Sequence, residues 1–272
     1  MSCKKLAIFT HGIRRGPFAA LGTTLSRGFM ELGYDCDLIV LNATAEEKAK
    51  YPHVNTISFN VSRAAFSLFP LVNYIRTHKP DIIFSMPWYF NVIAILARTL
   101  AGTHTKIIVG EHNICSLESK IEHGDKLNIK FLPLLMRFSY PYSDGLIAVC
   151  QDTIIDLIEN QKVSNQIPMK VISNPIDLER IQNLMTEPLS HPWFTNSNVP
   201  VILTVARMAK QKQLDVLINA FAEVIKIVPA KLLILGAGRR PSAQRQRSPT
   251  PRRSPPPPSR YPRSRRPLRA RR

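Results

Sequence analysis

Two cations in the second half of the chain are spaced to hold an anion. Arg207 follows an expected strand at 200–206, and Lys212 lies in the loop that enters an expected helix at 214–227. Cations at a helix N-terminus oppose the helix dipole unless an anion lies between them. A diphosphate would supply that anion, because Arg offers a planar fork and Lys a point charge. The alternative is a solvated basic loop, since Lys210 adds a third cation nearby.

A histidine stands at the end of another expected strand. His112 follows the segment 106–110 and adjoins Glu111. It could serve as a polar contact, a general acid or a ligand. The alternative is a polar residue at a strand end whose hydrogen bonds are satisfied within the protein.

Two glycines follow the first expected strand, at 5–10. The amides of Gly12 and Gly16 could approach an anion or a sugar closely, because glycine has no side chain in the way. A simple tight turn is the alternative, since the GxGxxG pattern of dinucleotide-binding loops is absent.

Short apolar runs alternate with amphipathic stretches, which is typical of a parallel sheet with helical crossovers. We expect strands at 5–10, 35–41, 55–59, 82–85, 106–110, 145–150, 169–172, 200–206 and 231–235. We expect helices at 21–33, 63–78, 91–100, 126–139, 153–159 and 214–227. Ligands of open parallel sheets bind beyond the carboxyl ends of the strands, where His112 and the two glycines fall.

The order of these elements predicts two α/β domains of unequal completeness. Residues 1–186 hold a complete Rossmann-like domain, and the polar, proline-containing segment 187–198 is the expected linker. Residues 199–238 hold one β-α-β unit, a fragment of a second Rossmann-like domain. Residues 239–272 form a tail rich in Arg, Pro and Ser without an apolar period, which we expect to be disordered.

The positive charge of the chain is concentrated in that tail. The 272 residues include 37 Lys+Arg and 19 Asp+Glu, a net charge of +18. Because 13 Arg and no acid lie in the tail, the first 238 residues carry 24 basic against 19 acidic residues, a net of +5. The tail could be a nucleic-acid-binding arm, an extension without a function, or an out-of-frame translation. A switch from 15 Lys and 9 Arg in the body to Arg alone favours the last interpretation, so nucleic acid is not the expected partner.

Cysteine spacing and hydropathy predict a soluble, cytoplasmic protein. The four cysteines lie far apart without a CxxC pair, which argues against a zinc ribbon or a disulfide framework. The longest apolar stretch, at 82–97, contains Pro87 and Asn91 and falls short of the roughly 20 residues that a membrane-spanning helix needs.

Several segments resemble, in order, the motifs of family 4 glycosyltransferases. Residues 205–221, VARMAKQKQLDVLINAF, are similar to the signature GRL-x-x-x-K-G-x-D-x-L-I-x-A-F, although Ala206 replaces its usual glycine. Residues 171–177, VISNPID, are similar to the segment that leads into the second domain of this family. Further similarities lie at 111–113, 144–149 and 232–238, and the resemblance covers about 4–238.

The resemblance implies a GT-B fold, in which two Rossmann-like domains face each other and the C-terminal one holds a nucleotide-diphosphate sugar. It implies that Arg207 and Lys212 stabilise the leaving diphosphate. His112 would be catalytic, in contact with the donor sugar near the reacting centre. Gly12 and Gly16 would belong to the loop where sugar and acceptor meet. The resemblance implies no metal and no cofactor, since the nucleotide sugar is a substrate.

The implied function is retaining transfer of a hexosyl-type sugar to a glycan or lipid-linked acceptor, in polysaccharide assembly. The place would be the cytoplasm, with peripheral contact at the inner membrane face. The family pattern continues beyond Gly238 to an E-x7-E motif that this sequence lacks, so we expect a truncated second domain and impaired activity. The alternatives are a nucleic-acid- or anion-binding protein acting through its Arg-rich tail and a sugar-nucleotide epimerase of the same fold. The segment with Arg207 and Lys212 fits the transferase better.

Overall fold

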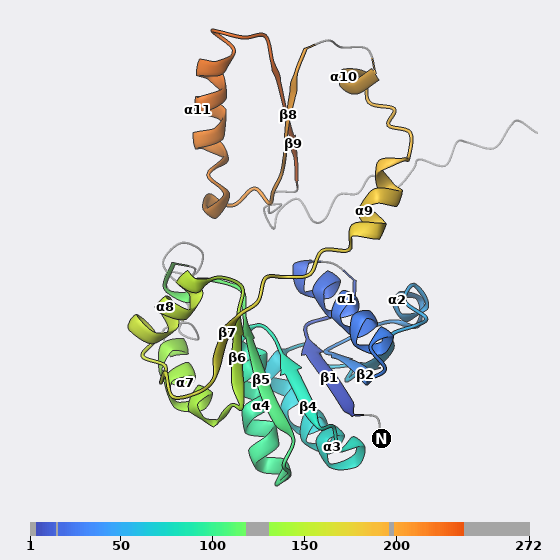
Figure 1. The fold of residues 1–272 in the computed structure, drawn as a ribbon, viewed down its shortest axis with the longest axis vertical. Coiled ribbons are helices and arrows are strands. Elements are labelled where there is room, and N and C mark those ends of the chain that lie inside the picture. The colour runs from blue at the N-terminus through green and yellow to red at the C-terminus, as the bar shows by residue number, and fades with distance from the viewer. Residues whose placement is uncertain (1–3, 15, 118–130, 196–198, 237–272) are drawn as a thin grey trace, which may run out of the picture. The chain divides into compact units, whose positions relative to one another are not determined.

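A computed structural model describes residues 4–14, 16–117, 131–195 and 199–236. It divides into two compact units, Met1–Asn196 and Ser197–Arg272 (Figure 1). The tail 239–272, which the sequence predicts to be disordered, and the start of the expected helix at 126–139 lie outside the described residues.

The first unit is built on one parallel sheet of seven strands in the order β3-β2-β1-β4-β5-β6-β7. The strands are β1 Lys5–Thr10, β2 Asp35–Val40, β3 Asn55–Ser58, β4 Ile82–Ser85, β5 Lys106–Glu111, β6 Gly145–Ala148 and β7 Met169–Val171. The strand order reverses its direction between β1 and β4. The predicted parallel α/β architecture is therefore confirmed, and its topological switch point lies at the centre of the sheet.

Helices connect these strands. They are α1 Pro17–Glu31, α2 Ala45–Ala49, α3 Leu68–His78, α4 Trp88–Ala101, α7 Leu132–Ser139, α8 Gln151–Glu159, α9 Leu178–Met185 and α10 Pro192–Thr195, with the 3-10 turns η1 Ala64–Ser67 and η2 Tyr140–Tyr142. Helix α1 begins four residues before the predicted start, because the fixed φ of Pro17 suits a first helical position. The predicted helix at 63–78 is η1 followed by α3. Helices α2, α9 and α10 were not predicted, and α10 lies within the expected linker.

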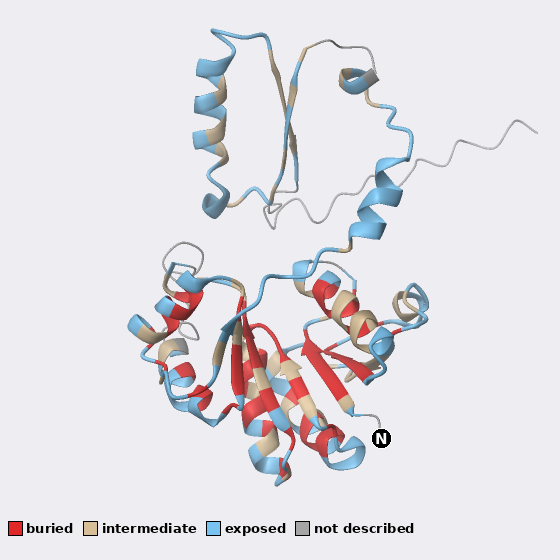
Figure 2. Ribbon diagram, in the orientation of Figure 1, coloured by how far each residue is buried: buried red, intermediate tan, exposed pale blue. Residues whose placement is uncertain are grey.

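The two faces of the sheet are covered unequally. The connection from β1 to β2 runs along the sheet in one direction, and the connections from β3 through β4, β5 and β6 to β7 run in the other. Because such crossovers are right-handed, α1 lies on one face of the sheet, and α3, α4, α7 and α8 lie on the other (Figure 1). The larger core therefore lies under α3, α4, α7 and α8, and a smaller one lies under α1 (Figure 2). On the α1 face of β4–β6, Phe84, Ile108 and Ile147 stay only partly buried.

The second unit contains one β-α-β element. Strands β8 Val201–Val205 and β9 Lys231–Leu235 pair in parallel, and α11 Leu214–Val224 connects them after the 3-10 turn η3 Lys210–Lys212. Gly236 passes so close to β8 that a Cβ atom there would lie 1.8 Å from the carbonyl oxygen of Ala206. Glycine is required at that position, because any side chain would push the two strand ends apart.

Among the described residues, every helix is too short or too polar to span the hydrocarbon core of a membrane.

Candidate functional site

His112 lies at the carboxyl edge of the sheet, directly after β5. Its Nε2 atom is buried and has no hydrogen-bond partner among the described residues. Burial lowers the pKa of His112, and the side chain of Asn174 partly opposes this effect. The imidazole is therefore neutral at pH 7, and a ligand that reaches Nε2 could donate a hydrogen bond to it or accept one from it.

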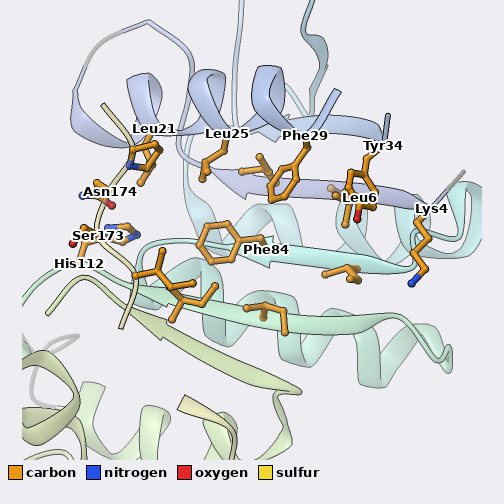
Figure 3. A pocket seen from close by; sticks show the side chains of 17 residues that line it. Lys4, Leu6, Leu21, Leu25, Phe29, Tyr34, Phe84, His112, Ser173 and Asn174 are labelled. Carbon is orange, nitrogen blue, oxygen red and sulfur yellow. The ribbon is translucent and has the colours of Figure 1, made fainter. Parts of the chain in front are cut away.

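Three segments that are distant in sequence meet around His112. The ring of Phe18, in the first turn of α1, packs edge-to-face on the imidazole with 5.1 Å between the ring centroids. Ser173 and Asn174, in the loop after β7, lie next to His112 (Figure 3). The surroundings of His112 therefore come from the ends of β5 and β7 and from the start of α1.

The structure places the predicted glycines in the loop between β1 and α1. Gly16 precedes α1 with φ of 102°, a backbone conformation that side chains disfavour. Two residues later, Phe18 touches His112, so this loop belongs to the same end of the sheet. Gly12 shows no steric need for glycine, since a Cβ atom there would meet only the carbonyl oxygen of Asn42, at 3.8 Å.

A buried polar network lies beneath His112. The carboxylate of Glu111, 1% exposed, accepts hydrogen bonds at Oε1 from Asn91 Nδ2, at 2.8 Å, and from the hydroxyl of Tyr140. Ser85 Oγ donates to Asn91 Oδ1 at 2.8 Å. Burial, with a smaller contribution from Glu111, raises the pKa of Tyr140 well above its usual value. The network anchors the end of β5 and thereby the backbone that carries His112.

Sequence reasoning missed this network because its members are far apart in the chain. One signal was available, since Asn91 interrupts the apolar stretch 82–97 and a buried amide needs hydrogen-bond partners. The identity of those partners could be read only from the fold.

A cavity of about 380 Å³ extends from His112 along the α1 face of the sheet (Figure 3). Its walls are Leu21, Leu25 and Phe29 of α1, and its floor includes Phe84, Ile108 and Ile147. Its polar side chains lie at its ends, with His112, Ser173 and Asn174 at one and Lys4 and Tyr34 at the other. The polar contacts that a sugar needs are therefore available at the two ends of this cavity, and the end at the carboxyl edge of the sheet is the one with His112.

Arg207 and Lys212 lie in the second unit, on the connection between β8 and α11. Both side chains are exposed, and Lys212 ends η3 just before Gln213, which has φ of 47° and precedes α11. No acidic residue lies between Arg207 and Leu214. The structure thus brings these two cations to one loop, and His112, Gly12 and Gly16 to one sheet edge of the other unit.

Sequence comparison finds one family for this chain. Residues 23–180 match the family described as Glycosyltransferase Family 4. No curated protein matches the chain.

Solved structures with a similar fold are numerous. The lipopolysaccharide outer core galactosyltransferase WaaB, in its apo form, has 17% identity and a TM-score of 0.55, with 86% of this chain and 61% of that chain covered. Anabaena Alr3699/HepE in complex with UDP-glucose has 16% identity and a TM-score of 0.61, with 85% and 60% covered. Sucrose-phosphate synthase from Thermosynechococcus elongatus has 12% identity and a TM-score of 0.60, with 85% and 62% covered. The chain therefore spans about 60% of the length of these proteins and shares their fold.

Proposed function

Because this chain belongs to Glycosyltransferase Family 4, we propose that it transfers a hexosyl-type sugar from a nucleotide-diphosphate donor to an acceptor, with retention of configuration at the sugar carbon. The observation that carries the proposal is the buried Nε2 of His112 at the carboxyl edge of the parallel sheet, which has no hydrogen-bond partner among the described residues. His112 lies within the segment that matches the family. The complex of HepE with UDP-glucose supports the class of donor.

Arg207 and Lys212 are proposed to bind the diphosphate of the donor. When the bond between the sugar carbon and the diphosphate breaks, negative charge grows on the leaving phosphate oxygen. A guanidinium and an ammonium stabilise that charge more strongly than the spread charge of the bound donor. Their exposure leaves both side chains accessible to a ligand.

His112 is proposed to contact the donor sugar near the reacting carbon. A neutral imidazole suits a hydroxyl group, because its ring nitrogens include one donor and one acceptor. The loop with Gly12 and Gly16 is proposed to lie where sugar and acceptor meet. Its approach to His112 through Phe18 supports this placement.

The acceptor is proposed to be a glycan or a lipid-linked glycan in polysaccharide assembly. The protein would act in the cytoplasm, and a lipid-linked acceptor would bring it into peripheral contact with the inner membrane face. The net charge of +5 on the first 238 residues is compatible with such a surface.

Isothermal titration with UDP tests the diphosphate site. We expect Lys212→Gln to weaken binding about tenfold, since one charge-assisted contact to phosphate is lost. Lys210→Gln is the matched control, because Lys210 is an exposed cation of the same turn, η3. Equal affinities of the two variants would remove Lys212 from the proposal.

The products separate transfer from epimerisation. Incubation of the full chain with UDP-glucose and a glycan acceptor should release UDP and form a glycoside with the anomeric configuration of the donor, both visible by NMR. An epimerase would instead form a second UDP-sugar without any acceptor. An inverted glycoside would contradict the retaining mechanism.

A further inference from the structure

Helix α7 is apolar on the side that faces away from the sheet. Four side chains, at positions i, i+3, i+4 and i+7, form one stripe and are 45–62% exposed: Phe131, Leu134, Leu135 and Phe138. Met136, which points the other way into the core, is fully buried. A helix that is apolar on both sides requires a second apolar neighbour.

The neighbouring helix α4 also exposes apolar side chains. Helices α4 and α7 contact each other on the same face of the sheet (Figure 1). Leu96 and Leu100, one helical turn apart, are 46% and 50% exposed. We name Leu96, Leu100, Phe131, Leu134, Leu135 and Phe138 the α4–α7 face. Large exposed apolar surfaces of this kind mark contacts with a protein or a membrane.

The charged residues of α3, α4 and α7 have one sign. Helices α3, α4 and α7 contain no Asp or Glu. Arg137 is exposed at the edge of the stripe, with its guanidinium carbon 5.8 Å from the ring centre of Phe138. Arg76 and Lys79 are exposed at the C-terminal end of α3, the next helix of this layer. Among the described acids, Asp144 forms an ion pair with Arg98 at 2.8 Å, and the exposed Asp152 and Glu159 lie on α8.

We propose that the α4–α7 face docks the protein onto a bilayer of anionic phospholipid. Exposed apolar side chains with Arg137 and Arg76 beside them match the boundary between acyl chains and anionic headgroups. Leucine and phenylalanine side chains would enter the acyl region, and Arg137 would lie among the phosphates. The purpose of this docking, access to a lipid-linked acceptor, rests on the proposed function. The contact with the bilayer itself requires neither the donor nor the acceptor.

A tryptophan placed in the stripe tests the contact directly. The full chain with Phe138→Trp is mixed with vesicles of phosphatidylcholine and phosphatidylglycerol, some of whose acyl chains carry bromine. We expect blue-shifted emission and quenching by the bromolipid. The matched control is Leu32→Trp, since Leu32 is 74% exposed at the end of α1, on the other face of the sheet, and should show neither change. The unsubstituted chain supplies the background of Trp88 and Trp193.

This readout separates the α4–α7 face from the 13 arginines of the tail, which attract anionic vesicles by themselves. Sedimentation with vesicles without quenching of Phe138→Trp would overturn the proposal and assign the binding to the tail. A blue shift that grows with protein concentration in the absence of vesicles, together with a dimer in sedimentation velocity, would also overturn it in favour of a second copy of the chain.

A double variant tests whether the face is necessary. We expect Leu134→Gln with Phe138→Gln to weaken partitioning into these vesicles by roughly tenfold or more, because two partly inserted apolar side chains are lost. UDP binding, which involves the other unit, should stay unchanged. Unchanged partitioning of the double variant would contradict the proposed docking. Failure of the unsubstituted chain to bind UDP would contradict only the proposed function.

Discussion

Tyr140→Phe should destabilise the first unit through the loss of one hydroxyl group. Tyr140 is fully buried, and its hydroxyl donates to Glu111 and lies 3.1 Å from Asn91 Nδ2. Its removal leaves the buried carboxylate with one donor fewer, at a cost of about 2 kcal/mol for a hydrogen bond to a charged group. In a domain of this size such a loss lowers the melting temperature by about 4–8 °C.

Urea denaturation followed by tryptophan fluorescence measures this loss, because both tryptophans, Trp88 and Trp193, belong to the first unit. Tyr142→Phe is the matched control. Tyr142 lies two residues away and is 67% exposed, so its change should stay within about 0.5 kcal/mol. Equal unfolding free energies of the two variants would refute the network as the anchor of β5. An unchanged slope against urea would show that both variants unfold the same surface.

Two further stability predictions concern the site. Burial lowers the pKa of His112 below its usual 6.5, so the unfolded chain binds more protons below that pH and stability falls as the pH drops from 7.5 to 5.5. The His112→Gln variant should lose less stability over that interval. Urea midpoints that fall equally with pH in the variant and in the unsubstituted chain would contradict this. Gly16→Ala should cost about 1 kcal/mol, because φ is 102° there, whereas Gly28→Ala, inside α1 with open space around it, should stabilise by up to about 1 kcal/mol. Melting temperatures that shift in the same direction for both variants would contradict the argument that the backbone at Gly16 disfavours a side chain.

Much of the sheet could be predicted from the sequence. β1, β4 and β9 have their predicted bounds, because each is a short apolar run closed by a turn or a polar residue. The helices expected between successive strands indicated that the strands pair in parallel. Two short helices were missed although their caps are visible: Thr44 and Glu47 form a capping box before α2, and Asp177 accepts from the amide of Arg180 at the start of α9.

The candidate site was predictable in part. The strand-end rule places His112 and the two glycines at the carboxyl edge, since it depends only on the direction of the strands. Phe18 and Asn174 reach His112 from other segments, and no spacing in the sequence records that meeting. The same holds for Tyr140 and Glu111, whose hydrogen bond depends on how α4 and η2 pack over β5.

The position of β1 in the sheet has a consequence for synthesis on the ribosome. β1 is made before the other six strands of its sheet, yet it lies in the interior of the sheet, with Leu6 paired to Cys36 on one side and to Ile82 on the other. Its apolar edge toward β4 therefore stays open until the chain has grown past Ser85, and the growing polypeptide must be kept from pairing that edge with a neighbour. A nascent chain halted between β3 and β4 should be bound by chaperones, and one halted after β5 should have released them.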